Sequence, residues 1–349
     1  LWWKLLRGFL AEQGFTQSKA DPCLYLRRKD GKLTIVCTYV DDMLITGDDD
    51  NTIEQFVKAM ADKWPVTTGP LNSFVGVHYQ YDRKNRTLSM RHAAFRKSIL
   101  AQHGFDDMTP VNHPRSPCDS QYGRKLTEDE VIEKGWREYP SQHQSALDEY
   151  ANIVGALIYD ATTIAPHFVF PVRQLCKHMH APTEYSATLL IRFLRWMQHE
   201  IDTPLVYRAQ SQGTQSKLNL TPVVFYDAGL SNTVSDSELR PSIGYTSFIA
   251  VCLVDYRSLT LHHAAVGSNE AEAHAATHAT TGARWLRDLI LELQLTTPEP
   301  ALVVGDNEGT TGLPTKGASI SNRHYWARVF NFLQCARHKL IVSAFMMIP

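Results

Sequence analysis

The sequence has few cysteines, and no two of them form a Cys-x-x-Cys pair. The 349 residues contain six, at Cys23, Cys37, Cys118, Cys176, Cys252 and Cys335. Scattered cysteines in a chain of this size favour reduced thiols and argue against a cysteine zinc site. We therefore expect an intracellular protein of the cytoplasm, nucleus or an organelle matrix, and not a secreted one.

Long apolar runs and an excess of positive charge are also missing. No apolar run reaches the length that spans a bilayer, so we expect neither a transmembrane segment nor a membrane partner. The formal net charge is -1, so no overall positive field attracts nucleic acid, although local basic patches could still bind it. The start, Leu1-Trp2-Trp3-Lys4, has no initiator methionine and is no signal peptide, and we expect it to continue a longer chain.

Two adjacent acids, Asp41 and Asp42, lie between two apolar runs rich in β-branched residues, 33–38 and 43–47. This pattern predicts a hairpin that presents the two carboxylates at its tip. One interpretation is a divalent metal site that handles phosphate, because buried carboxylates need a neutralising cation. The other is a polar turn between two strands. The acids 48–50 that follow are interpreted as a loop and a helix N-cap.

The rest of the chain alternates between folded blocks and linkers, within a composition of 44% hydrophobic and 20% charged residues that is typical of globular proteins. Before residue 220, periodicity predicts helices at 2–15, 94–104 and 148–163 and after Pro166 and Pro182, and a second hairpin at 71–81 and 87–90. After residue 220, we predict strands at 223–226, 243–254, 258–262 and 302–304 and helices at 270–293 and 322–334, with either a terminal strand or a tail docked on the core at 341–346.

Three acids in the second half lie at the ends of three different predicted elements. Asp227 ends a strand, Glu270 begins the long helix and Asp306 ends another strand. Such acids could converge to hold two magnesium ions, as in two-metal phosphodiester hydrolysis. We predict Glu270 as the helix ligand, because Glu272 lies about 200° further round the helix. His274 and the histidine one turn beyond it could form a pair of zinc ligands, but no motif in the sequence supplies the remaining ligands. We therefore favour the interpretation that the two histidine side chains are packed or exposed and bind no metal.

Tyr39-Val40-Asp41-Asp42 resembles the palm-domain active-site hairpin of reverse transcriptases, specifically those of copia-type LTR retrotransposons. The likeness extends to Ser18-Lys19-Ala20-Asp21-Pro22 and Phe74-Val75-Gly76-Val77. The second half resembles the ribonuclease H domain that follows in copia-type polyproteins. Its matching segments are Phe225-Tyr226-Asp227-Ala228, Ser268-Asn269-Glu270-Ala271-Glu272-Ala273 and Gly305-Asp306-Asn307.

The resemblance implies an α/β (α+β) chain with a ribonuclease H-like mixed sheet. Its expected parts are a partial palm and thumb at 1–105, a linker at 106–145, a helical connection at 146–208, a linker at 209–220 and a ribonuclease H-like domain at 221–349. The implied catalytic residues and Mg²⁺ or Mn²⁺ ligands are Asp41, Asp42, Asp227, Glu270 and Asp306. The residues expected to contact an RNA–DNA hybrid or template-primer are Tyr39, Arg91, Lys97, Arg323 and His324, and Arg96 is a further candidate for a phosphate contact.

Departures from the family pattern leave two hypotheses. The family's fingers and first palm acid have no counterpart in the sequence, so we expect no polymerase activity from this chain alone. Trp326 occupies the position of the fourth ribonuclease H acid. The chain is therefore expected to cleave hybrids weakly at most. The alternative is an inactive, degenerate or domesticated copy that needs no metal cofactor and binds protein partners within a larger assembly.

Overall fold

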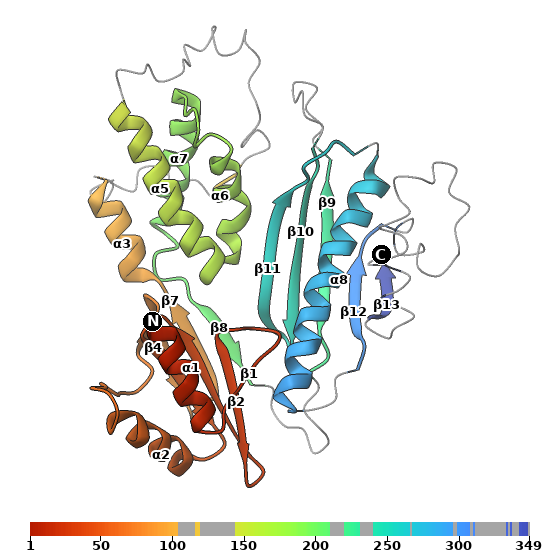
Figure 1. Ribbon diagram of the computed structural model, residues 1–349. Helices are drawn as coiled ribbons and strands as arrows, with labels where there is room; N and C mark the ends of the chain where they lie inside the picture. The colour runs from red at the N-terminus through yellow and green to blue at the C-terminus, as the bar shows by residue number, and fades with distance from the viewer. Residues whose placement is uncertain are drawn as a thin grey trace, which may run out of the picture.

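The computed structural model describes residues 1–103, 116–118, 144–209, 220–230, 240–265, 267–295, 299–307, 310, 333, 336 and 342–347. The described residues build three β-sheets and the helices that cover them, as Figure 1 shows. The predicted α/β class with a mixed sheet is confirmed. The predicted linkers and the helix at 322–334 lie almost entirely outside the described residues.

The N-terminal sheet is antiparallel and carries the Asp41–Asp42 hairpin. Its elements are α1 (Trp2–Glu12), β1 (Thr16–Gln17), β2 (Leu24–Lys29), β3 (Lys32–Tyr39), β4 (Asp42–Gly47) and α2 (Asp50–Ala61), with the strands in the order β1-β2-β3-β4. Apolar residues of both helices and of β3 are fully buried, among them Leu10, Val36 and Phe56. Asp49 caps α2, because its carboxylate accepts a 3.0 Å hydrogen bond from the backbone N–H of Thr52.

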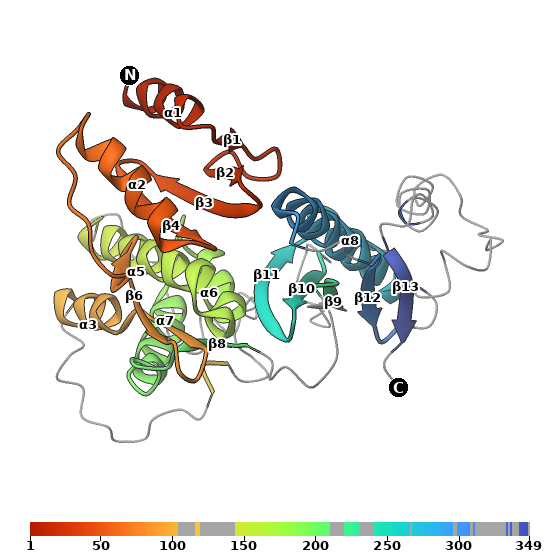
Figure 2. The same ribbon diagram turned by 90° about the horizontal axis from the view of Figure 1, so that it is seen from below.

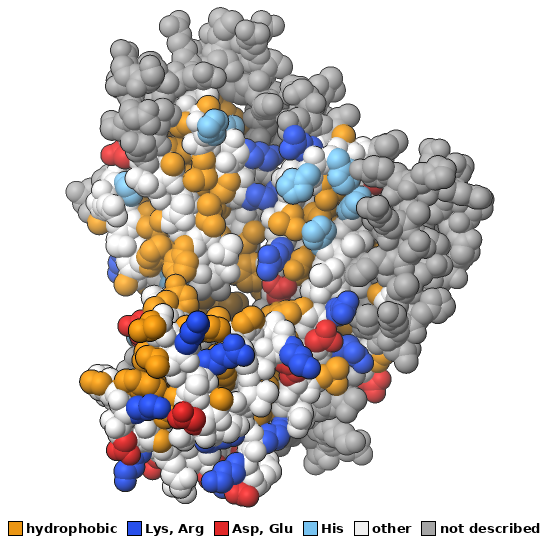
Figure 3. Space-filling model, viewed as in Figure 1, with side chains coloured by type: hydrophobic (Ala, Val, Ile, Leu, Met, Phe, Trp, Pro, Cys, Tyr) orange, Lys and Arg blue, Asp and Glu red, His pale blue; other side chains and the backbone are white. Residues whose placement is uncertain are grey.

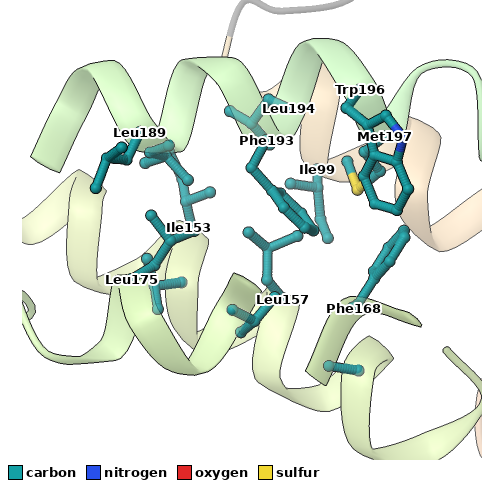
Figure 4. Packing of buried hydrophobic residues seen from close by; sticks show 14 of the residues in the cluster. Ile99, Ile153, Leu157, Phe168, Leu175, Leu189, Phe193, Leu194, Trp196 and Met197 are labelled. Atoms are coloured by element: carbon teal, nitrogen blue, oxygen red, sulfur yellow. The ribbon is translucent and has the colours of Figure 1, made fainter. Parts of the chain in front are cut away.

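A second sheet is completed by a strand that comes after the helical block. Its strands are β5 (Ser73–Phe74), β6 (Val77–Asp82), β7 (Thr87–Arg91) and β8 (Leu205–Arg208), and its helices are α3 (Ala93–Gln102), α5 (Gln144–Thr163), η2 (Pro166–Phe168), α6 (Val169–Cys176) and α7 (Glu184–Met197). The core of α3 is continuous with that of α5 and α7. In Figure 4, Leu189 and Phe193 of α7 lie against Ile153 and Leu157 of α5.

A buried ion pair joins α3 to α5 beneath this core. Arg96 Nε lies 2.7 Å from a carboxylate oxygen of Asp160, and both side chains are fully buried. His92 Nδ1 lies 2.8 Å from the other oxygen. The expectation that Arg96 contacts phosphate is therefore wrong, because Asp160, which lies far away in the sequence, withdraws the guanidinium from the surface.

The C-terminal sheet has the order β11-β10-β9-β12-β13. Its strands are β9 (Val223–Gly229), β10 (Ser242–Ile249), β11 (Cys252–Thr260), β12 (Ala301–Gly305) and β13 (Val342–Met347). The first three pair antiparallel, whereas β12 is parallel to both β9 and β13. The predicted strand over 243–254 is wrong, since Ala250 and Val251 form a turn with positive φ between β10 and β11.

The long helix α8 (Ser268–Leu293) covers one face of this sheet. Figure 2 shows the helix beside the strands of this sheet, with one helix end nearest β1 and β2. Small residues let it approach closely, and Ala275, Ala279 and Ala283 are buried against the sheet. Within the described ranges, no helix is both long and apolar enough to span a bilayer.

Candidate carboxylate site and hairpin

Three carboxylates meet at the ends of two neighbouring interior strands of the C-terminal sheet. β9 and β12 are parallel, with Val304 opposite Phe225. Two residues further along both strands, Asp306 therefore follows β12 beside Asp227 of β9. Glu272, in the first turns of α8, completes the group, and one carboxylate oxygen from each acid lies within 4.8 Å of the others.

Glu272 is the buried member of this group. Its side chain is 5% exposed, and Oε1 accepts a 3.2 Å hydrogen bond from the backbone N–H of Ala228. Oε2 is buried and has no hydrogen-bond partner among the described residues. Burial, together with the charges of Asp227 and Asp306, raises the pKa of Glu272 to about 7, against the opposing effect of the Ala228 bond. A divalent cation would fit here, because it would neutralise the group and occupy the unpartnered oxygen.

Glu270, which the sequence analysis assigned to this group, lies elsewhere. It is buried beside His263 and His274, so its predicted grouping with Asp227 and Asp306 is wrong. A signal for the correct choice was present in the helix pattern. Glu272 lies three and seven residues before Ala275 and Ala279, on the helix face that packs against the sheet.

The Asp41–Asp42 hairpin forms as predicted, with Tyr39 paired to Asp42 at the ends of β3 and β4. Both acids are exposed, so they carry no burial cost that a metal must offset. They line an open groove of about 1450 Å³ between the hairpin, α2 and residues 64–76. No third potential ligand lies close enough to both acids to complete a metal site, counting only the described part of the chain.

The predicted nucleic-acid contacts are partly available at the surface. Tyr39 is 53% exposed at the hairpin tip, and Lys97 is exposed on α3. Arg91 is half-buried and its Nε lies 3.7 Å from the carboxylate of Asp202. The other predicted contacts, Arg323 and His324, and the departure at Trp326 lie outside the described residues.

Comparison with known proteins shows which families this chain resembles. The reverse transcriptase (RNA-dependent DNA polymerase) family matches residues 1–117. The retrovirus-related Pol polyprotein from transposon RE1 of Arabidopsis thaliana is 26% identical over 337 residues, or 95% of this chain. The chain is thus similar over nearly its whole length to copia-type retrotransposon polyproteins. A second relative, the retrovirus-related Pol polyprotein from transposon TNT 1-94 of Nicotiana tabacum, is 22% identical over 94% of the chain.

The chain spans about a fifth of those copia-type relatives, 21% of the first and 24% of the second. Among solved structures, the N-terminal RNase H domain of a Mycobacterium tuberculosis protein is similar to this chain, with a TM-score of 0.29 and 12% identity. The matched region covers 37% of this chain and 88% of the solved chain. The match to the reverse transcriptase family and the Pol polyprotein relatives confirm the resemblance to copia-type retrotransposon polyproteins that the sequence indicated.

Proposed function

We propose that the C-terminal region hydrolyses the RNA strand of RNA–DNA hybrids with the help of divalent metal ions. The observation that carries the proposal is the convergence of Asp227, Glu272 and Asp306 from three separate elements. One buried oxygen of Glu272 has no partner among the described residues. All three side chains offer only oxygen, the ligand type that Mg²⁺ and Mn²⁺ prefer.

The two aspartates differ from Glu272 in their exposure, and we assign their roles accordingly. Asp227 and Asp306 are exposed, so their oxygens face the side from which a phosphodiester would approach. Glu272 accepts a hydrogen bond from the Ala228 N–H, which holds its carboxylate close to the two aspartates. Divalent ions bound here would activate water and stabilise the leaving oxygen.

For the N-terminal hairpin we propose no polymerase activity by this chain alone. Asp41 and Asp42 are exposed, and no third ligand joins them among the described residues. Two carboxylates are a poor clamp for two metals and a triphosphate. The groove beside them, with Tyr39 exposed near its rim, is proposed to contact the template-primer only when a further palm acid is supplied.

The test is cleavage of a labelled RNA–DNA hybrid in Mg²⁺ or Mn²⁺ by the wild-type chain and by Asp227→Asn. We expect metal-dependent cutting that a chelator stops and that the variant lacks. The control substrate is the all-DNA duplex of the same sequence, which is expected to stay intact. A folded wild-type chain that cuts no hybrid in either metal would overturn the proposal.

The competing proposal is a structural subunit that binds another protein. It is favoured by exposed apolar side chains on the N-terminal part, where Trp3 and Leu5 of α1 are 52% and 54% exposed. Figure 3 shows apolar side chains gathered over that part of the surface. Exposed large apolar groups that lie close together are typical of interfaces. An inactive but folded wild-type chain would favour this function.

A further inference from the structure

A second cluster of potential metal ligands lies at the start of α8, apart from the three carboxylates. It consists of His263, Glu270 and His274, and one ligand atom from each lies within 4.8 Å of the others. Glu270 and His274 are four residues apart on α8, so both side chains project from the same helix face. His263 comes from the loop that joins β11 to α8. Figure 3 shows histidine side chains gathered in the region near this end of the helix.

The two imidazoles meet through the nitrogen atoms that would bind a metal. Nε2 of His263 lies 3.2 Å from Nε2 of His274, and the rings stand edge to face with centroids 4.8 Å apart. Two nitrogens on one tetrahedral zinc ion, each about 2.05 Å from the metal, are about 3.3 Å apart. The observed separation therefore already matches one edge of a zinc coordination sphere.

The ligand set also selects the metal. We propose that His263, Glu270 and His274 form a Zn²⁺ site. Two imidazole nitrogens with one carboxylate are a zinc-type set, whereas Mg²⁺ favours oxygen ligands alone. Glu270 is 2% exposed and both histidines are half-buried, so an ion bound here would be largely shielded, and water would supply the fourth ligand of a tetrahedral zinc.

Zinc bound here would act as a link between two segments. It would join the loop before α8 to the first turns of the helix, where its ligand Glu270 lies two residues before Glu272. Glu270 and Glu272 lie about 200° apart around the helix axis, so the zinc site and the carboxylate site use opposite sides of the same turns. The zinc ion would then hold the helix start in place without entering the carboxylate site, and it would stabilise the folded chain because the unfolded chain lacks the site.

The experiment measures zinc alone, by calorimetric titration of the metal-free chain and by zinc content after desalting. The wild-type chain is expected to bind one Zn²⁺ at this site. His274→Gln and His263→Gln are expected to weaken binding by more than the roughly 10- to 100-fold that loss of an outer partner causes. His262→Gln is the matched control, because His262 is the exposed neighbour in the same loop and is not part of the cluster.

Two further measurements separate this site from the carboxylates and from misfolding. Asp227→Asn is expected to bind zinc as tightly as the wild-type chain does. Zinc is expected to raise the Tm of the wild-type and of His262→Gln but not of His263→Gln, whose change lies in a loop. Absence of binding, equal binding by the histidine variants, or loss of binding in Asp227→Asn would each overturn the proposal, whatever the outcome of the hybrid-cleavage assay.

Discussion

The carboxylate of Glu292 accepts a 2.5 Å hydrogen bond from the hydroxyl of Ser18, 274 residues earlier in the chain. It also accepts hydrogen bonds from the backbone N–H of Lys19. Close by on α8, the indole N–H of Trp285 donates to the carbonyl oxygen of Ala20. The start of α8 thus supplies the buried member of the carboxylate group, and its end is anchored to the N-terminal sheet.

We predict that Glu292→Gln loosens this anchor. Burial alone would raise the pKa of Glu292, but the hydrogen bonds from Ser18 and Lys19 hold it below its ordinary value, so these bonds favour the charged form. The variant is expected to lose about 1 kcal/mol of unfolding free energy, measured in urea, because charged hydrogen bonds are replaced by neutral ones. Amide exchange at residues 18–20 should also become faster. Glu54→Gln, an exposed change on α2, is the control; an equal loss there would contradict the prediction.

Gly305 permits the close packing that places Asp306. A Cβ atom at this position would lie 2.3 Å from the ring of Tyr226, which is buried in the core under α8. Gly305→Ala is therefore expected to cost about 1–3 kcal/mol through overpacking, seen as a lower Tm, and to weaken hybrid cleavage by displacing Asp306. Gly229→Ala has open space around it and should leave the Tm nearly unchanged. Equal Tm values for the two variants would show that the sheet adjusts freely.

The buried pair of Arg96 and Asp160 is predicted to dominate the stability of the helical block. Asp160→Asn would leave the buried guanidinium without its counter-charge, at an expected cost of about 3–5 kcal/mol in urea unfolding. Asp202→Asn, at a residue whose side chain is 76% exposed near Arg91, should change stability by about 0.5 kcal/mol or less. A cost below 1 kcal/mol for Asp160→Asn would contradict the prediction.

The same buried pair makes the stability of the folded protein depend on pH. Burial would raise the pKa of Asp160, but the hydrogen bonds from His92 and Arg96 outweigh it and leave the pKa below its ordinary value. A carboxyl whose pKa is lowered by folding stabilises the protein fully above its unfolded pKa of about 3.9 and loses that contribution as the pH falls through the folded value. The stability difference between the wild-type and Asp160→Asn should therefore shrink as the pH is lowered below about 4.

Local features of the fold could be predicted because the signals lie within a few residues of each other. A helix was predicted after Pro182, and α7 begins there with Thr183 as its N-cap, because the Thr183 hydroxyl accepts a hydrogen bond from the backbone N–H of Ser186. By contrast, the turn at Ala250 and Val251 could not be predicted from the sequence, because neither residue type is typical of the positive φ that both adopt.

The candidate site was predicted only in part, for a tertiary reason. Strand ends at Asp227 and Asp306 can be recognised from the apolar runs before them. The choice between Glu270 and Glu272 depends on which helix face packs on the sheet, and the contacts of Ala275 and Ala279 settle that choice. Similarly, the burial of Arg96 depends on Asp160 across a long stretch of chain. Both errors arose because the side chains were placed from residue spacing along one helix, without knowledge of the surface that the helix faces.

The most direct test of the account is the initial rate of RNA–DNA hybrid cleavage by Glu272→Gln beside the wild-type chain in Mg²⁺. Asp288→Asn, at a half-exposed residue of the same helix, serves as the control. We predict that Glu272→Gln lowers the rate by more than ~100-fold, since losing a ligand costs more than losing an outer partner, and that the control keeps the wild-type rate. A folded Glu272→Gln chain that cuts the hybrid at the wild-type rate would contradict the role assigned to this carboxylate.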